Sequence, residues 1–209
     1  MYIPPHFDLG SADEARALMR ARAFATLVTS DEDGAPFATH LPLLFEDDGS
    51  PHGKLLGHVA RPNPHWRLFG RGTPTLAVFH GPHAYISPNW YTSPNLVPTW
   101  NYTAVHAYGT PQILAEDTDA LKVVERLADT FESSLPEPWS TARLPPGNAL
   151  AQMKGIVAFE MPIDRLQAKS KVGQNRLPVD RHSAADALQA QGGEDNVAIA
   201  TLMRGLSAA

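Results

Sequence analysis

Short stretches of alternating apolar and polar residues, separated by polar turns, occupy the first third of the chain. The stretches are rich in β-branched and aromatic residues, and the turns between them read Asp-Glu-Asp-Gly and Asp-Asp-Gly-Ser. Alternation with a period of two indicates half-buried strands, and turns of this composition favour tight reversals. The pattern therefore predicts a meander of three antiparallel strands at residues 24–29, 36–45 and 54–60.

The later part of the chain continues the β pattern and adds helices. Further strands are expected at residues 74–80, 84–87, 99–115 and 155–161, the third of them broken or bulged at Gly109 and Pro111. Apolar residues three and four positions apart predict helices at 11–22, 117–131, 148–154, 183–191 and 195–205, the second capped by Asp117 or Thr118. Short strands with peripheral helices predict an α+β fold, a small β-barrel with helical decoration.

Residues 85–109 are the most unusual part of the sequence because aromatic side chains and prolines are concentrated there. The prolines stiffen the first half into a loop that cannot pair as a strand. From residue 99 onward, alternation places one set of side chains on a single strand face: Trp100, Tyr102, Ala104, His106 and Tyr108. These rings either fill the core of the barrel or form a surface for a planar ligand or a dimer partner. The polar Asn101 beside two rings favours the surface, but both interpretations stay open.

The composition restricts the function more than the fold. The chain has 209 residues, enough for one sizeable core, and a formal net charge of −5 at pH 7. The absence of cysteine excludes disulfides, thiolate metal sites and thiol nucleophiles. The negative charge disfavours a simple nucleic-acid binder, which normally carries a basic surplus. No apolar run approaches a membrane span and no signal sequence opens the chain, so we expect a cytoplasmic protein with no membrane partner.

Residues 58–66, with the sequence HVARPNPHW, contain the first candidate anion site. Asn63 is a favourable helix cap and Pro64 suits the first helical position, so a short helix is expected to run to Gly70. The free N–H groups of that helix and the guanidinium of Arg61 together would form a seat for a phosphate. The alternative is that Arg61 is an ordinary surface charge after a strand.

A second cationic cluster lies late in the chain, in a stretch without acidic residues. It comprises Arg165, Lys169, Lys171 and Arg176. Gln174 and Asn175 add neutral donors and acceptors at the same place. The cluster is a solvated loop, a second anion contact or a patch for DNA.

Histidines provide the remaining candidates. Thr39 and His40 lie on the second expected strand, where His40 either binds a ligand or is a satisfied interior residue. His80 and His83 have a spacing found in metal sites, but they flank a turn and have no carboxylate close in sequence, so no metal site is predicted. Walker A, GxGxxG, HExxH and GxSxG motifs are absent, which leaves hydrolase and Rossmann-type functions without support.

Five segments together resemble the PaiB-type FMN-binding negative transcriptional regulators: MYIPPHF, HVARPNPHW, YISPNWY, VPTWNYTAVHAYG and KVGQNR. They follow the order of that family from residue 1 to about residue 176. The resemblance implies a flavin split barrel, similar to pyridoxamine phosphate oxidase, that dimerises and places FMN at the subunit interface. It also implies an FMN-binding domain at residues 1–176 and a helical appendage at 177–209. The chain departs from the family pattern at Pro62 and at Gly173, where serine is common.

The same resemblance implies which residues contact FMN, although it assigns no catalytic residue. One wall of the flavin site would consist of Thr39, His40, His58, Arg61 and Asn63. The aromatic side would consist of Trp100, Asn101 and Tyr102. Late contacts would come from Lys171, Gln174, Asn175 and Arg176.

Three functions are compatible with this resemblance. The first is an FMN-binding regulator. The second is a flavin-dependent oxidoreductase of reductase or oxidase type, or a haem-binding relative with His6, His40 or His106 as a ligand, because a fold does not fix a function. The third is DNA binding, which the family name implies. The last two expected helices superficially resemble a helix-turn-helix, but they are acidic, so we expect no strong sequence-specific DNA binding by the isolated protein.

Overall fold

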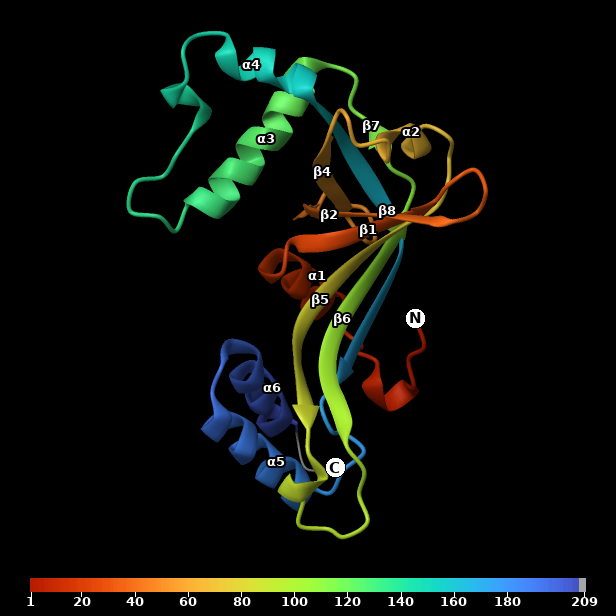
Figure 1. The fold of residues 1–209 in the computed structure, drawn as a ribbon, viewed down its shortest axis with the longest axis vertical. Helices are drawn as coiled ribbons and strands as arrows, with labels where there is room; N and C mark the ends of the chain where they lie inside the picture. Colours follow the sequence, from red (N-terminus) through yellow and green to blue (C-terminus); the bar gives the residue numbers. More distant parts are fainter. Residues whose placement is uncertain (207–209) are drawn as a thin grey trace. The chain divides into compact units, whose positions relative to one another are not determined.

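The computed structural model describes residues 1–206 and shows an antiparallel sheet with helices, as predicted (Figure 1). The strands are β1 (Phe24–Ser30), β2 (Pro36–Pro42), β3 (Leu44–Glu46), β4 (Lys54–Ala60), β5 (Thr75–Ile86), β6 (Thr99–Gly109), β7 (Gln112–Ile113) and β8 (Ile156–Lys171). The α-helices are α1 (Ala12–Ala21), α2 (Trp66–Phe69), α3 (Asp117–Glu132), α4 (Asn148–Gln152), α5 (Pro178–Gln191) and α6 (Glu194–Gly205). Short 3-10 turns lie at Pro5–Phe7, Pro88–Trp90, Thr141–Arg143 and Met153–Gly155.

The strands follow the order β2-β1-β5-β6-β8-β4-β3, and β7 pairs with β8 beside this path. The first hairpin, β1 with β2, is antiparallel over its whole length and turns at Asp31, whose side chain accepts hydrogen bonds from the backbone N–H groups of Asp33 and Ala35. Gly34 completes that turn at a φ of 83°, a conformation that favours glycine. Composition alone therefore located this reversal correctly.

The expected strand at 36–45 is in fact two strands that serve different hairpins. β2 pairs with β1, whereas β3 pairs with β4. Leu43, between them, is fully buried and its N–H donates to the carbonyl oxygen of Ala23 at 2.8 Å. The predicted order of the meander is correct, but its middle strand is interrupted because Leu43 leaves the ladder to enter the core.

The two strands expected at residues 74–80 and 84–87 are one continuous strand. The residues expected to form two strands around Gly81 and Pro82 form the single strand β5. A β-carbon at position 81 would lie 1.9 Å from Oγ1 of Thr103, so glycine here permits close approach of a neighbouring chain segment instead of a turn. β1 pairs with β5 only over Thr75–Val78, so Pro82 lies beyond that pairing and its missing N–H costs no bond to β1.

The last strand and two helices also differ from expectation. β8 continues ten residues past the expected end at residue 161. Pro162 does not stop the strand, because it lies at the last pair between β8 and β4, opposite Lys54. Helix α3 has Glu116 as its N-cap with no side-chain bond, so the predicted caps Asp117 and Thr118 were wrong. Helix α5 starts at Pro178, five residues early, because proline suits the first turn of a helix.

The described residues form two compact units that interleave along the chain. Unit 1 contains residues 1–18, 80–105 and 167–206, and unit 2 contains residues 19–79 and 106–166. In unit 1, α5 and α6 lie side by side (Figure 1). Their residues Leu188, Ile199 and Met203 share a core with Ala84 and Ile86 of β5 and with Val172, which follows β8. In unit 2, Val123 and Leu127 of α3 pack with Leu56 of β4, Ala158 of β8 and Met153 of the turn before β8.

The N-terminal residues are held within unit 1. The amino group of Met1 donates to Oε1 of Gln167 at 2.7 Å, and Phe7 is buried. Among the described residues, no helix is both long enough and apolar enough to cross a membrane.

Candidate functional site

The predicted contact residues fall into two groups, one in each unit. The group in unit 2 contains Thr39, His40, His58, Arg61 and Asn63. The group in unit 1 contains Trp100, Asn101, Tyr102, Lys171, Gln174, Asn175 and Arg176. Each group has its own geometry and is described separately.

Thr39 of β2 begins a chain of hydrogen bonds that runs into the interior of unit 2. Its hydroxyl lies 2.8 Å from Nδ1 of His65 and accepts a hydrogen bond from Nδ2 of Asn63 at 3.1 Å. On the far side of the ring, Nε2 of His65 lies 2.9 Å from the hydroxyl of Thr29, which in turn lies 2.7 Å from the hydroxyl of Thr75. Asn63, Thr39, His65 and the two threonines therefore form one connected network.

His65 is the centre of this network, and sequence reasoning did not select it. The ring is fully buried between Phe37 and Phe69, and burial lowers the pKa of His65 to about 4. The imidazole is therefore neutral near pH 7 and has a single N–H. The only sequence signal was its position after Asn63-Pro64, where the backbone N–H of His65 donates to Oδ1 of Asn63 at 3.0 Å.

The tautomer of His65 determines what the hydroxyl of Thr39 can offer a ligand. If the proton is on Nε2, Thr39 donates its hydrogen to Nδ1 and has only lone pairs left. If the proton is on Nδ1, the ring donates to Thr39, and the hydroxyl hydrogen is free to point at another acceptor. The hydroxyl of Thr39 can therefore act toward a ligand either as a hydrogen-bond donor or as an acceptor. Its hydrogen bonds with His65 and Asn63 fix its position.

The two other histidines of this group differ in environment. His40 is exposed, and its Nδ1 lies 3.0 Å from the hydroxyl of Thr26 on the paired strand. His58 on β4 is half-buried, and desolvation lowers the pKa of its imidazole. Its Nδ1 is buried without a hydrogen-bond partner among the described residues. An orphaned ring nitrogen of this kind is what a polar ligand atom could satisfy.

Arg61 does not form the anion seat that the sequence suggested. Its Nε and Nη2 donate to the carbonyl oxygens of Lys154 and Ile156 at 2.6 and 2.7 Å. The helix that follows is only four residues long and begins at Trp66 instead of Pro64, so its N–H groups do not open beside Arg61. The guanidinium therefore joins the β4 end to the start of β8, with part of its donor set still free at the surface.

In the part of β6 that belongs to unit 1, Trp100 is exposed and Tyr102 is only partly buried, so these rings do not fill a core. The alternate side chains Asn101, Thr103, Val105 and Ala107 are buried, whereas Trp100 is 54% exposed. Trp100 lies 5.9 Å from the ring of Tyr85, edge to face. Interpretation of this strand as a core strand packed with aromatic rings was therefore wrong.

Asn101 requires a correction. It lies on the buried face of β6, opposite Trp100 and Tyr102, and is only 2% exposed. Its Nδ2 lies 3.4 Å from Sδ of Met203, within the core of unit 1. The structure therefore assigns Asn101 to packing and gives no support to direct ligand contact.

The late cationic cluster lies on the end of β8 and the turn after it, not on a solvated loop. Nζ of Lys171 donates to Thr99 Oγ1 and, at 2.9 Å, to the carbonyl oxygen of Trp100. Burial, followed by the charges of Lys169 and Arg176, lowers the pKa of Lys171. Arg176 stacks on Tyr91 with its Cζ 5.4 Å from the ring centroid. Three cations thus lie close together in unit 1, whereas Arg165 belongs to unit 2 and stacks on Tyr108.

Gln174 and Gly173 shape the turn that follows β8. Gln174 accepts from the N–H of Val172 at 2.8 Å and donates to the carbonyl oxygen of Ser170 at 2.6 Å, so its amide closes the turn. Gly173 has a φ of 88°, a conformation that favours glycine. Asn175 is exposed beside this turn.

Asp180 anchors the proline-rich loop of unit 1 and was not selected from the sequence. Its Oδ1 accepts hydrogen bonds at 2.8 Å from the N–H and hydroxyl of Thr92 and from the N–H of Ser93. These bonds lower the pKa of Asp180 to about 2, and the side chain is 1% exposed. The loop that leads to Trp100 is therefore held by a buried carboxylate at the start of α5.

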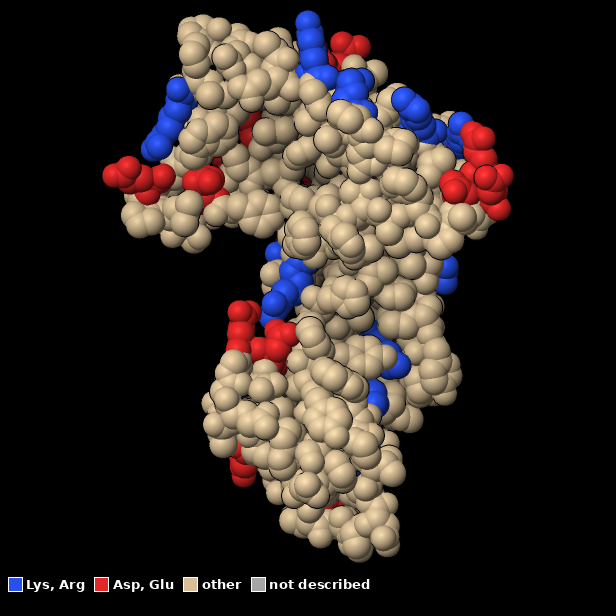
Figure 2. Space-filling view, in the orientation of Figure 1, with Lys and Arg blue, Asp and Glu red and all other residues tan. Residues whose placement is uncertain are grey.

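The face shown in Figure 2 has no continuous cationic patch. On the face shown in Figure 2, Lys and Arg side chains are scattered among acidic and uncharged ones. Arg204 of α6 is paired with Asp186 of α5 at 2.7 Å. His83, one of the two histidines with metal-like spacing, is 3.1 Å from Asp195, and the described residues contain no cluster of metal-binding side chains.

Comparison with known proteins places this geometry in a family. Residues 1–165 match the family model described as "Putative FMN-binding domain". The chain is 39% identical over 205 residues to the protease synthase and sporulation protein PAI 2 of Bacillus subtilis, covering 97% of this chain and 96% of that protein.

Solved structures show the same fold at low sequence identity. The FAD and haem binding protein from Mycobacterium smegmatis superposes with a TM-score of 0.60 at 19% identity, covering 77% of this chain and 71% of that one. A flavocytochrome from Azotobacter vinelandii superposes with a TM-score of 0.61 at 14% identity, covering 77% and 67%. The eight-stranded antiparallel sheet with helices agrees with the predicted α+β fold, and these two solved structures share it. The chain therefore belongs to the FMN-binding-domain family that includes the PAI 2 protein, as its sequence motifs predicted.

Proposed function

We propose that the protein binds FMN as a homodimer, with the flavin at the subunit interface, and acts as a regulator of the PaiB type. Family membership supports the choice of FMN over other flavins. Two features of the chain fit such a ligand: an accessible aromatic surface with neighbouring cations in unit 1, and a group of incompletely satisfied polar side chains in unit 2.

The observation that carries this proposal is the exposed ring face on β6. An isoalloxazine is flat and aromatic, and stacking against indole or phenol rings buries area that would otherwise face water. Trp100 and Tyr85 are 54% and 45% exposed and lie edge to face, so the two rings together offer an aromatic patch that a flat ligand or a partner could cover. This surface is the proposed contact for the ring system.

The phosphate is assigned to the cluster of Lys171 and Arg176 in preference to Arg61. Two of the donor groups of Arg61 are used by backbone carbonyls. Lys171 also donates two hydrogen bonds, but it lies close to Lys169 and Arg176, whose charges, after burial, lower its pKa. A phosphate dianion would relieve that repulsion and form charge-assisted hydrogen bonds.

The wall from unit 2 supplies directional contacts. Thr39 offers a hydroxyl held by His65 and Asn63, and His58 offers a buried Nδ1 that lacks a partner among the described residues. The edge of a flavin ring carries both donors and acceptors, so these groups suit it chemically. His40 and Arg61 remain proposed contacts at the margin of this wall.

Bound FMN would supply two-electron or one-electron redox chemistry, so the alternative function is a flavin-dependent oxidoreductase. The discriminating measurement is oxidation of a nicotinamide by the FMN-loaded protein. Turnover that disappears in the Lys171→Ala variant would favour the enzyme over the regulator.

A comparison of FMN with riboflavin tests the proposed contacts. The purified protein should show flavin absorbance or take it up at micromolar FMN. Lys171→Ala should weaken FMN binding by about tenfold or more, because bonds between charged groups contribute about 1.5–3 kcal/mol, and should leave riboflavin affinity unchanged. Trp100→Ala should weaken both ligands. Lys122→Ala and Trp139→Ala, at surface positions outside both groups, are the matched controls.

Each outcome separates one part of the proposal from the rest. A colourless protein that binds no FMN would refute the function. If Arg61→Ala abolishes FMN binding and Lys171→Ala does not, the phosphate binds at Arg61, as the sequence first suggested. A monomer in light-scattering measurements of the FMN-loaded protein would refute the subunit-interface position.

A further inference from the structure

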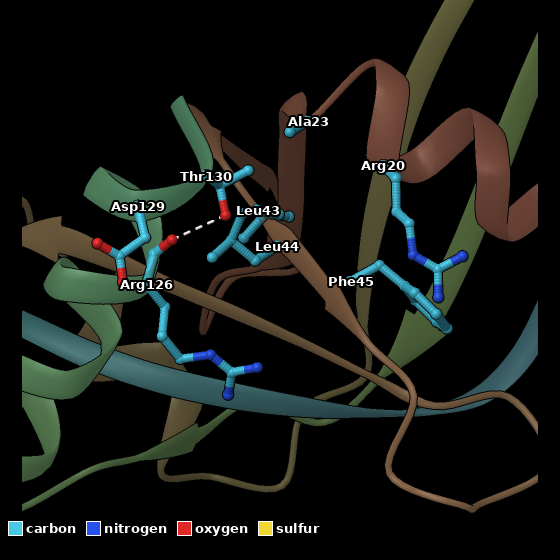
Figure 3. Close-up of a pocket in the computed structure, with 8 residues that line it drawn as sticks. All are labelled: Arg20, Ala23, Leu43, Leu44, Phe45, Arg126, Asp129 and Thr130. Carbon is cyan, nitrogen blue, oxygen red and sulfur yellow. Dashed lines mark hydrogen bonds between the residues drawn. The ribbon is translucent and has the colours of Figure 1, made fainter. Parts of the chain in front are cut away.

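Unit 2 contains a cavity that shares no residue with either group of proposed FMN contacts. Its volume is about 410 Å³, within the range of small-molecule sites, and all its lining residues belong to unit 2. Figure 3 shows the lining side chains: Arg20, Ala23, Leu43, Leu44, Phe45, Arg126, Asp129 and Thr130.

The cavity combines an apolar floor with cationic sides. Leu43 is fully buried and Ala23 and Phe45 are nearly so, and in Figure 3 the side chains of residues 43–45 lie between the two arginines. Arg20 comes from the last turn of α1 and Arg126 from α3. A ligand in this cavity would therefore meet hydrocarbon in the middle and a guanidinium on two sides.

The two arginines differ in their existing partners. Nη1 of Arg126 donates to Oε2 of Glu46 at 2.9 Å, so its charge is already balanced. Arg20 stacks on Phe45, with its Cζ 4.8 Å from the ring centroid, and has no carboxylate partner among the described residues. A guanidinium stays protonated and binds carboxylates in a two-pronged manner, so Arg20 is the anchoring cation.

The remaining polar side chains limit the charge of the ligand. The hydroxyl of Thr130 donates to the carbonyl oxygen of Arg126 at 2.8 Å, drawn as a dashed line in Figure 3, so its one hydrogen is used within α3. Asp129 adds a carboxylate to the lining on the α3 side, which would repel a second negative charge. The arrangement therefore disfavours polyanions such as nucleotides and accommodates a single charge.

We propose that this cavity binds an amphipathic monoanion, a small carboxylic acid with an aromatic or aliphatic body. The carboxylate pairs with Arg20 and the body lies on Leu43, Leu44 and Phe45. Burial of the apolar body supplies affinity at about 25 cal/mol per Å², and the guanidinium supplies the preference for an anion. The site is independent of FMN because its lining belongs to neither contact group.

The test uses three probes of equal shape and different charge. 1-Naphthoate, uncharged 1-naphthamide and cationic 1-naphthylmethylamine are titrated into the full-length protein, with binding followed by calorimetry and by methyl NMR signals of Leu43 and Leu44. We expect naphthoate to bind about tenfold or more tightly than naphthamide and the amine to bind weakest. Equal binding of all three, or no saturable naphthoate binding at millimolar concentration, would refute the site.

Variants locate the binding. Arg20→Gln, at an exposed helix position, should reduce naphthoate affinity about tenfold and leave naphthamide unchanged. Leu44→Trp should fill the cavity and block both. Arg67→Gln, which removes a guanidinium stacked on Trp66 outside the cavity, is the matched control.

A final arm separates this site from the flavin surface, because an aromatic acid could also stack on Trp100. Naphthoate is titrated in the presence and absence of saturating FMN. Unchanged affinity supports the independent cavity, whereas competition with FMN, or loss of binding in Trp100→Ala but not in Arg20→Gln, overturns it.

Discussion

The buried histidine of unit 2 makes a quantitative prediction about stability and pH. His65 is fully buried, its ring nitrogens are 2.8 and 2.9 Å from the hydroxyls of Thr39 and Thr29, and its pKa is about 4 against an ordinary value of 6.5. Because the folded pKa is depressed, protons bind the unfolded chain more tightly. The stability that His65 contributes is therefore complete above pH 6.5 and declines as the pH falls toward 4.

The expected size follows from the pKa difference. At about pH 5 the unfolded imidazole is almost fully protonated and the folded one mostly neutral, which lowers the free energy of unfolding by about 2 kcal/mol relative to pH 7.5. His65→Phe lacks this contribution. Between about pH 7.5 and about pH 5 its free energy of unfolding should therefore fall by about 2 kcal/mol less than that of wild type. Histidines such as His58 titrate in both proteins, so the difference between them isolates His65.

The same variant tests the hydrogen-bond network at constant pH. His65→Phe keeps a ring between Phe37 and Phe69 but removes partners from two hydroxyls, one of them the buried Thr29. An unsatisfied buried polar group costs about 1–3 kcal/mol, so we expect a loss of about 2–4 kcal/mol at neutral pH. Thr29 keeps its contact with the hydroxyl of Thr75 but loses the one with His65, so His65→Phe/Thr29→Val should recover part of this loss.

Urea unfolding followed by tryptophan fluorescence, at about pH 5 and about pH 7.5, measures both effects in the wild type and the two variants. If the free energy of unfolding changes by the same amount with pH in wild type and in His65→Phe, the claim that His65 is buried in its neutral form is refuted. A His65→Phe variant as stable as wild type at neutral pH would refute the network.

Other predictions concern single residues. Gly81→Ala should lower the free energy of unfolding by about 1–3 kcal/mol, since the new β-carbon would lie 1.9 Å from Thr103 Oγ1. Adding Thr103→Ala should restore part of this loss. Thermal unfolding measures both effects, and a Gly81→Ala variant as stable as wild type would contradict the close approach. Asp180→Asn should expose residues 91–93 to limited proteolysis faster than the surface variant Asp186→Asn does; equal cleavage would show that Asp180 does not hold the loop. The isolated protein should form no salt-dependent nanomolar complex with operator DNA in mobility-shift assays, and detection of one would contradict the charge argument.

Local patterns in the sequence predicted local structure well. The turn of the first hairpin, helices α1 and α6, and the break after Gly109 were all located within a residue or two, because caps, turns and alternation are encoded by neighbouring residues. The alternation on β6 also separated the faces of the strand correctly, although it could not tell which face was buried.

Features that depend on distant residues could not be predicted. Gly81 resembled a turn because its actual constraint, the nearby Thr103, lies far away in sequence. His65 and Asp180 resembled ordinary polar residues because their burial and partners appear only after folding. Arg61 resembled a free cation until the carbonyl oxygens of Lys154 and Ile156, more than ninety residues away, were found to hold it.

Calorimetric titration of the purified full-length protein with FMN tests the central claim most directly, because it reports affinity and stoichiometry together. The proposed function predicts saturable binding with a micromolar or lower dissociation constant and one FMN per chain. Absence of measurable heat, together with unchanged thermal stability in excess FMN, would contradict it.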